Sequence, residues 1–559
     1  MEAPFSNVRR NYIRHAFAGA FLFIGVQLVA QEDHAHMHMG NAGELGKVNF
    51  PVSCDAKTQK QFEAAVAMLH SFWYDQSEKN FAEITKTDPQ CGIAYWGIAM
   101  SLWHPLWQPP DNATLKKGWD IVETARSKGG KTELENELIA ALELFYKDYD
   151  KAPALARTKA YEDAMKKIYD KYPDNTEVSA FYALSILGTV QAMLPFVDKT
   201  YAKQKQAEQI LEKIFTAQPS HPGASHYIIH SFDYPDLATL ALPAARNYAK
   251  IAPASPHAQH MPSHIFTRLG LWDESIASNI ASAQTAKDFV EKNKPGCASY
   301  DQLHALDYLE YAYLQCGEDK KAQEVCDELK PMNKVDRDEL AAAYAFAAVP
   351  TRFAIERSQW KLAADLELHP AGFSWNLYPQ AEAIIHFGRA VGYARTGDIK
   401  SSDNEIQKIK SLYDTLVSRK MMYWAGQTKI LETEGQAWNA FAQKKFDDAL
   451  TKMKDAVNIE DSSEKHPVTP GAILPAHEQL GDLLLLLNKP ADAFPEYETS
   501  LKSAPNRFNS LYGAARSAQL KGDKTSAAKY YIQLMSLTSH ADTERPELKE
   551  ARTFVAAKN

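Results

Sequence analysis

The chain has 559 residues, of which 45% are hydrophobic and 24% are charged, a composition typical of well-packed globular or repeat proteins. This length predicts several domains or one long solenoid. The formal net charge of −8 excludes the strongly basic surface that nucleic-acid binding requires, so we expect no nucleic-acid partner.

The start of the chain has the features of an export signal. Three arginines precede an apolar run at 16–29, which is too short to span a membrane stably. Leu28 and Ala30 suit cleavage after Ala30, so we expect a signal peptide at 1–30 and a mature start at Gln31. No later apolar run reaches the length of a membrane span. We therefore expect a bacterial periplasmic or secreted protein whose mature chain has no membrane span.

The predicted mature start, QEDHAHMHMG, alternates imidazole with thioether side chains. The residues concerned are His34, His36, Met37, His38 and Met39. Imidazole and thioether ligands together favour copper, which makes this stretch a second candidate metal region. The alternative is an ordinary flexible leader at 31–52, because no packed structure is expected there.

Five cysteines are few for an exported chain of this length. Cys54 and Cys91 flank the first expected helical hairpin, and we predict a disulfide between them. Cys297, Cys316 and Cys326 leave one thiol unpaired in any arrangement. The absence of a CxxC motif gives no support to a zinc ribbon or to a thioredoxin-like site.

Sequence repeats recur along most of the chain with a period of about 34 residues. In one clear unit Gly481, Ala493, Tyr497 and Pro505 stand at positions 8, 20, 24 and 32, and the unit that begins at Phe508 follows the same pattern. In these features the chain resembles the tetratricopeptide repeat (TPR) family. The resemblance implies an all-α solenoid of stacked helix–turn–helix units with a concave groove.

The quality of the repeats divides the chain into three expected parts. We expect an N-terminal TPR-like array at 53–300, degenerate TPR-like repeats at 301–465 and C-terminal TPR repeats at 466–559. Segments within about 44–280, among them HMPSHIF at 260–266, also resemble a group of exported bacterial TPR proteins. This second resemblance implies no mechanism.

Histidines recur at the groove-facing positions of three successive units. In the TPR family, positions 2, 5, 9 and 12 of the first helix of a unit face the groove, and helical spacing independently places these positions on one stripe. The stripes carry His226, His230 and Asp233, then His257, His260 and His264, then His304, Asp307 and Tyr311. The first two stripes repeat with the period of the TPR units.

This pattern predicts a metal site on the groove wall. Neighbouring helix axes lie about 8–10 Å apart, so imidazoles from two units can meet around one ion. Histidines spaced i, i+4 also chelate metals well. The predicted metal ligands are His226, His230, Asp233, His257, His260 and His264. Imidazole ligands permit zinc, copper or iron and do not decide among them.

A catalytic role for the ion assigns further residues. Asp307 would complete or orient the ligand shell, and His304 or Tyr311 would move protons, which makes these three the predicted catalytic residues. A zincin protease is disfavoured, because Tyr227 and Met261 stand where an HExxH motif requires glutamate. Whether the protein is an enzyme stays open.

A non-catalytic scaffold is the alternative function. TPR proteins usually bind a peptide or a partner protein in the groove, and the histidine stripe would then be a polar wall. His70 and His104, which are also separated by one repeat period, lie among tryptophans. These side chains are either large core residues or the wall of a site for a small organic ligand.

Overall fold

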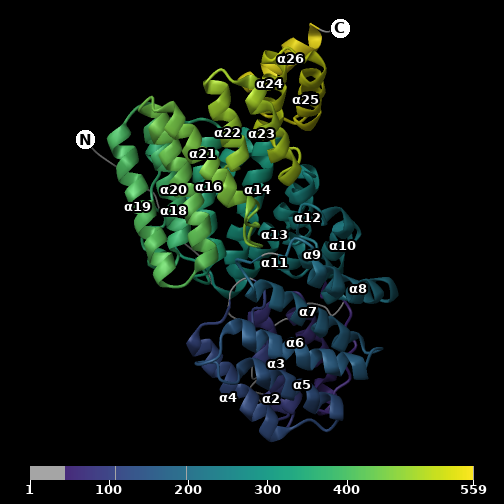
Figure 1. Ribbon diagram of the computed structural model, residues 1–559. Helices are drawn as coiled ribbons and strands as arrows, with labels where there is room; N and C mark the ends of the chain where they lie inside the picture. The colour runs from purple at the N-terminus through teal and green to yellow at the C-terminus, as the bar shows by residue number, and fades with distance from the viewer. Residues whose placement is uncertain (1–43, 107–108, 197, 558–559) are drawn as a thin grey trace, which may run out of the picture. The chain divides into compact units, whose positions relative to one another are not determined.

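The computed structural model describes residues 44–106, 109–196 and 198–557, and its regular structure is helical (Figure 1). Within these ranges no residue belongs to a β-strand, and one isolated bridge joins Ala298 to Val335. The prediction of an all-α fold is confirmed. The predicted signal peptide and the histidines and methionines of the leader lie outside the described ranges.

Eight helices precede the predicted histidine units in the described part of the chain. They are α1 (Gln59–His70), α2 (Tyr74–Thr87), α3 (Gly92–Ser101), α4 (Asn112–Lys128), α5 (Glu133–Tyr146), α6 (Ala154–Lys171), α7 (Thr176–Ala192) and α8 (Ala202–Ala217), after a 3-10 turn, η2 (Ala56–Thr58). Consecutive helices pack against each other. A disulfide joins Cys54 to Cys91, which stands directly before α3.

Six helices form the histidine-bearing region. They are α9 (Pro222–Ser231), α10 (Ala238–Ile251), α11 (Pro256–His260), α12 (Pro262–Leu269), α13 (Trp272–Asn293) and α14 (Tyr300–Cys316). α9 packs on α10, α10 packs on α12, and α13 packs on α14. The starts of α9 and α11 are separated by one repeat period, as the sequence predicts.

The remaining helices continue the pairwise packing. They are α15 (Asp319–Leu329), α16 (Leu340–Glu356), α17 (Trp360–Ala364), α18 (Pro379–Thr396), α19 (Ile399–Ser418), α20 (Met422–Ala442), α21 (Phe446–Asp461), α22 (Ala476–Leu486), α23 (Pro490–Ser503), α24 (Phe508–Leu520), α25 (Lys524–Leu537) and α26 (Pro546–Ala556), with a 3-10 turn, η3 (Trp375–Leu377), before α18. The starts of α18 and α20 are further apart than those of α9 and α11, so the middle units are longer than the TPR period. No helix in the described ranges has the length and apolar character that crossing a membrane requires.

Small residues allow the helices of a pair to approach closely. Ala65, Ala493 and Ala527 are all 0% exposed. A Cβ atom on Gly481 or on Gly513 would lie 2.7 or 2.2 Å from the nearest ring atom of Tyr497, closer than any carbon–carbon contact. The TPR pattern of small and aromatic residues is therefore a packing requirement of the helix pair.

The packed chain begins earlier than the expected end of the leader at residue 52. Leu45 and Phe50 are only 1% and 2% exposed. The ring of Phe50 lies edge-on to those of Phe62 and Trp96, at centroid distances of 5.4 and 6.1 Å. The short apolar stretch at the end of the expected leader thus belongs to the first core, because burying it removes aromatic surface from water.

A long connection between α21 and α22, residues 462–475, crosses to the histidine-bearing helices; we call it the crossing segment. Lys465 Nζ contacts Asp233 Oδ2 at 2.9 Å, although the two residues are far apart in the sequence. Tyr308 of α14 donates hydrogen bonds to the carbonyls of Pro467 and Thr469, at 3.2 and 2.8 Å. The segment therefore lies directly on the wall where the sequence predicts a site.

Candidate metal centre

The sequence explains why two of the ligand-bearing helices begin in register. α9 starts at Pro222 after His221, whose Nδ1 accepts a backbone N–H from the first turn at 3.2 Å. α11 starts at Pro256 after Ser255, whose hydroxyl accepts the equivalent N–H at 3.3 Å. Proline suits a first helical position because no hydrogen bond is lost there. The matching starts place corresponding histidines at corresponding turns.

Pro262 divides the histidine stripe of the second unit. α11 ends at His260 and α12 begins at Pro262, which has no N–H to continue the helical hydrogen bonds. His257 lies against His226 of α9, with ring centroids 5.1 Å apart. His260 instead packs against His304 of α14. The division into two groups therefore falls within α11, between His257 and His260, and not at Pro262.

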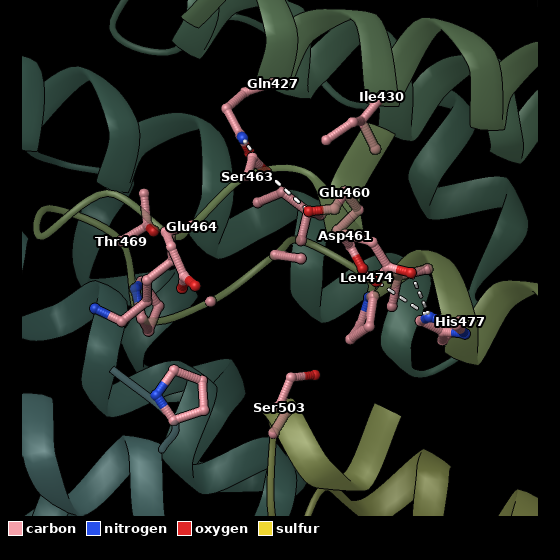
Figure 2. A pocket seen from close by; sticks show the side chains of 18 of the residues that line it. Gln427, Ile430, Glu460, Asp461, Ser463, Glu464, Thr469, Leu474, His477 and Ser503 are labelled. Atoms are coloured by element: carbon pink, nitrogen blue, oxygen red, sulfur yellow. Dashed lines mark hydrogen bonds and ion pairs between the residues drawn. The ribbon is translucent and has the colours of Figure 1, made fainter. Parts of the chain in front are cut away.

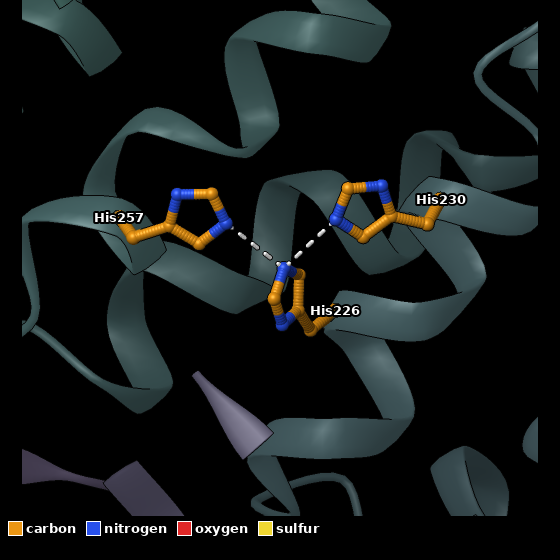
Figure 3. A group of neighbouring side chains, drawn as sticks. All are labelled: His226, His230 and His257. Atoms are coloured by element: carbon orange, nitrogen blue, oxygen red, sulfur yellow. Dashed lines mark hydrogen bonds between the residues drawn. The ribbon is translucent and has the colours of Figure 1, made fainter. Parts of the chain in front are cut away.

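The first triad consists of His226, His230 and His257, and all three side chains are buried. Nε2 of His226 lies 3.1 Å from Nε2 of His230 and 3.2 Å from Nε2 of His257, as the two dashed lines in Figure 3 show. Two nitrogens bound at about 2.1 Å to one ion lie about 3.0–3.4 Å apart in octahedral or tetrahedral geometry. The observed spacing suits three imidazoles that share an ion.

The second triad consists of His260, His264 and His304, which are 2%, 2% and 8% exposed. Nε2 of His260 lies 3.0 Å from Nε2 of His264, and the ring centroids of His260 and His304 are 4.2 Å apart. One nitrogen from each ring lies within 4.8 Å of the other two. The third unit thus contributes His304 to this group.

Hydrogen bonds on the far side of the rings decide which nitrogen carries the proton. His260 Nδ1 lies 2.7 Å from Oδ1 of Asn279, whose amide group donates to Ser275 at 2.8 Å and so keeps the oxygen toward the ring. His264 Nδ1 lies 3.0 Å from Oδ2 of Asp233. Both contacts are acceptors, so both Nδ1 atoms carry hydrogen in the neutral rings. His226 Nδ1 likewise faces a backbone carbonyl, that of His70, at 2.6 Å.

The consequence is a conflict between two lone pairs. With Nδ1 protonated, Nε2 of neutral His260 and Nε2 of neutral His264 are both acceptors. They nevertheless face each other at 3.0 Å in a buried place. Such a pair is unfavourable unless a cation lies between the two nitrogens. Outer hydrogen bonds of this kind also orient metal-bound histidines and fix their tautomers.

Asp233 connects the second triad to two cations. Its carboxylate accepts from Arg268 Nε at 2.9 Å and from Lys465 Nζ at 2.9 Å, in addition to His264. Burial opposes ionisation, but Lys465 and Arg268 together hold the pKa of Asp233 well below its usual value. Burial lowers the pKa of Lys465 to about 8. Asp233 therefore orients a ligand as a carboxylate and is not placed as a ligand itself.

Both triads border one small cavity of about 30 Å³. Its wall includes His230 and His257 of the first triad and His264 and His304 of the second. The crossing segment closes it with Pro467 and Val468. This volume has room for about one or two water molecules. A larger cavity of about 320 Å³ lies on the other side of His230 and Asp233.

The structure does not bring Asp307 or Tyr311 into the triads. Asp307 Oδ1 accepts from Arg352 Nη1 at 2.9 Å, and Arg507 Nη1 donates to Tyr311 Oη at 3.3 Å. Tyr308 instead packs on the second triad, with its ring 5.0 Å from that of His264. In a helix, the side chain at i+3 points about 60° to one side of the side chain at i, and the side chain at i+4 points about 40° to the other side. Seen from His304, Asp307 and Tyr308 therefore point toward different neighbours. The insertion before α14 obscured this register in the sequence.

A third histidine cluster has complete hydrogen bonding. Glu177 of α7 accepts from His70 Nε2 at 2.7 Å and from His221 Nε2 at 3.1 Å. Tyr227 Oη lies 2.9 Å from His70 Nδ1 and donates to it. Although burial opposes ionisation, the two histidines lower the pKa of Glu177 to about 2. This cluster needs no ion, because every ring nitrogen has a protein partner.

The crossing segment also borders a cavity of about 400 Å³ on its other side. Figure 2 shows part of its lining, with Glu464 and Thr469 on the crossing segment and His477 on α22. Gln427 of α20 donates to the Ser463 hydroxyl at 3.2 Å, which ties the segment to that helix. This hollow has space for a side chain or a small organic molecule.

Comparisons with known proteins find only partial structural likeness. No family model matches the chain, and no curated protein matches it. Solved structures with partial likeness include the APC/C Cut9–Hcn1 hetero-tetramer, with 12% identity over 90% of both chains and a TM-score of 0.26. The human IFIT1 dimer with m7Gppp-AAAA has 13% identity over 80% of this chain and 90% of that one, with a TM-score of 0.34. Yeast Tom70 has 11% identity over 90% and 96%, also with a TM-score of 0.34. Likenesses this weak carry no argument about ligands or partners.

Proposed function

We propose that this protein binds a transition-metal ion through the second triad. The observation that carries the proposal is the 3.0 Å approach of Nε2 of His260 to Nε2 of His264 while both Nδ1 atoms face acceptors. An ion between the two lone pairs would replace repulsion by two coordinate bonds, and His304 would supply a third. Imidazole ligands suit zinc, copper or iron.

A proton is the rival occupant, because a protonated His264 could donate to His260. Burial disfavours this arrangement and lowers the pKa of His264, although Asp233 favours the charged ring. Lys465 and Arg268 already pair with Asp233, and their two positive charges exceed its one negative charge by one. A shared proton would add a third charged donor to this buried group. A metal ion binds the neutral ring, and a lowered pKa keeps His260 and His264 neutral and available as ligands.

Metal analysis of the purified protein tests the proposal. Protein purified without chelators should retain a transition metal through desalting, measured by inductively coupled plasma mass spectrometry. The measurement uses a background variant in which the three leader histidines are replaced by alanine, so that copper bound by the leader does not contribute. His221→Ala is a matched control, since it removes a buried histidine from the hydrogen-bonded cluster. A chain that retains no ion after loading with zinc, copper or iron contradicts the proposal.

A scaffold function is the second candidate, and one observation favours it. The helical repeat encloses a cavity of about 400 Å³ beside the crossing segment, so a peptide side chain or a small organic ligand has a place to bind. In this candidate function the crossing segment would take the place of a bound peptide, because it packs on the histidine-bearing helices. Affinity purification with a chain shortened at 466–472 should capture more partner protein than the full chain if the segment occupies the partner's place.

We propose further that the protein is exported. The arginines and the apolar run within 1–30 support a periplasmic or secreted protein that begins at Gln31. Mass spectrometry of the protein from its native cells should show this terminus. An intact Met1 would remove the support for an extracytoplasmic location.

A further inference from the structure

The first triad has the same arrangement of buried imidazoles as the second. The Nε2 atoms of His230 and His257 both point at Nε2 of His226, and the two contacts form a V (Figure 3). The carbonyl of His70 holds the Nδ1 proton of His226, so the nitrogen at the centre of the triad presents a lone pair. Three nitrogens around one point form the ligand set of a metal ion on this side as well.

The two triads are direct neighbours. The ring centroids of His230 and His264 are 6.2 Å apart, and those of His257 and His260 are 6.3 Å apart. Both triads border the same cavity of about 30 Å³. Ions held by neighbouring triads would therefore face a common space that admits only one or two small molecules.

Charge indicates what that space holds. Six neutral imidazoles cannot compensate two divalent ions, and Asp233 is already paired with Lys465 and Arg268. Among the described residues that line the cavity, only Glu339 is acidic, and it also faces Arg337 at 3.5 Å. Buried charge requires compensation nearby. A small anion between the ions would supply it.

We infer that the two triads form a two-ion metal centre whose shared cavity binds a small inorganic anion, such as hydroxide, between the ions. Each ion has three imidazole ligands, and the anion takes an open position of both. This inference rests on the proposed metal binding and adds a second ion and a ligand class. Pro467 and Val468 of the crossing segment line the cavity, and its volume of about 30 Å³ suits a small anion.

The stoichiometry of bound cobalt(II) tests the second ion, with the leader histidines replaced throughout. The background chain should hold two ions, His257→Ala should hold one, and His304→Ala should hold one. His221→Ala should keep two, and circular dichroism with thermal unfolding should show that each variant is folded. A chain without any ion contradicts the proposed function. A folded background chain with a single ion, or two ions in both triad variants, overturns only the two-ion centre.

Azide is the probe for the shared anion. Titration of the cobalt-loaded chain should change its visible absorption at a ratio of one azide per two ions. Each single-ion variant should bind azide at least tenfold more weakly, because one of the two positive charges is lost. Equal azide affinity in the background chain and in both variants overturns the bridging arrangement. His257→Gln provides a second test of the first triad if His257→Ala does not fold.

Discussion

Two buried clusters of this protein, each built from three side chains and rich in histidine, differ in hydrogen bonding. In the cluster of His70, Glu177 and His221, a carboxylate accepts from both rings. In the second triad, His260 and His264 turn two lone pairs toward each other at 3.0 Å. Both clusters are buried, so solvent cannot relieve either of them. The difference lies in where the protons are held.

The comparison teaches that a metal site is recognised by its outer partners as much as by its ligands. Asn279 and Asp233 accept hydrogen bonds from the Nδ1 atoms of His260 and His264. The Nε2 atoms of these two rings are then both acceptors, and they face each other. Glu177 stands between its two histidines and accepts from both. By burial and by the closeness of their side chains alone, the two clusters would be equally good candidates for a metal site. The tautomers separate a stabilising network from a candidate centre.

The largest expected effect is on stability and lies in the hydrogen-bonded cluster. Glu177→Ala should lower the free energy of unfolding by about 3–5 kcal/mol, because two buried histidines lose their common partner. Urea denaturation measures this change, and metal content should be unaltered. Glu133→Ala removes the same group from a side chain that is 72% exposed and should have little effect. Loss of metal in folded Glu177→Ala would show that the two clusters are not independent.

Replacing two of the proposed ligands should weaken metal binding and leave the fold intact. His260→Ala combined with His264→Ala should weaken metal binding at the second triad by more than about 100-fold, which exceeds the effect of losing an outer partner. The metal-free variant should remain folded, since the replacement also removes the facing lone pairs. Competition with a chromophoric chelator measures the affinity. An unchanged affinity and stoichiometry would place the ion elsewhere.

Removing the charge of an outer partner should have a smaller effect. Asp233→Asn should weaken metal binding by about 10–100-fold, because His264 loses the carboxylate that orients it. The same competition assay applies, with Asp236→Asn as the control at an exposed carboxylate on the same turn. Equal affinities in the two variants would show that Asp233 serves only to pair Arg268 and Lys465.

The smallest effect is the pH dependence of the metal-free chain. Burial lowers the pKa of His226 and of His304 to about 3, against about 6.5 in an unfolded chain. The unfolded state therefore binds more protons between these values, and the free energy of unfolding falls as the pH drops from about 6.5 toward 3. His304→Ala should reduce this slope by up to about 1.4 kcal/mol per pH unit.

Denaturant titrations of the metal-free chain at several pH values measure that slope. The contribution of Glu177 has a different window, since its pKa of about 2 lies below the value of about 4.3 for a free glutamate. Its stabilisation is complete above about pH 4.3 and is lost only as the pH falls further toward 2. Identical slopes for the wild type and His304→Ala between pH 6.5 and 4.5 would contradict burial of a neutral ring.

The helical fold and the histidine stripes were predictable from local spacing. Residues separated by one repeat period occupy equivalent places when each unit packs only on its neighbours, so His226 and His260 could be aligned without a structure. The roles of Asp307 and Tyr311 were not predictable in this way. An insertion before α14 shifted the third unit, and a shift of one position turns a helical side chain by about 100°.

The sequence by itself determined the all-α repeat and the set of groove histidines, because helical periodicity and the repeat length are local properties. Only the tertiary structure decided the division into two triads, since it depends on the different neighbours of His257 and His260 and on His304 from a third unit. It alone also placed Asn279 and Glu177 beside the rings and Lys465 against Asp233. Those contacts join residues that are separated in the chain, and no local pattern records which ring nitrogen they leave to face a neighbouring imidazole.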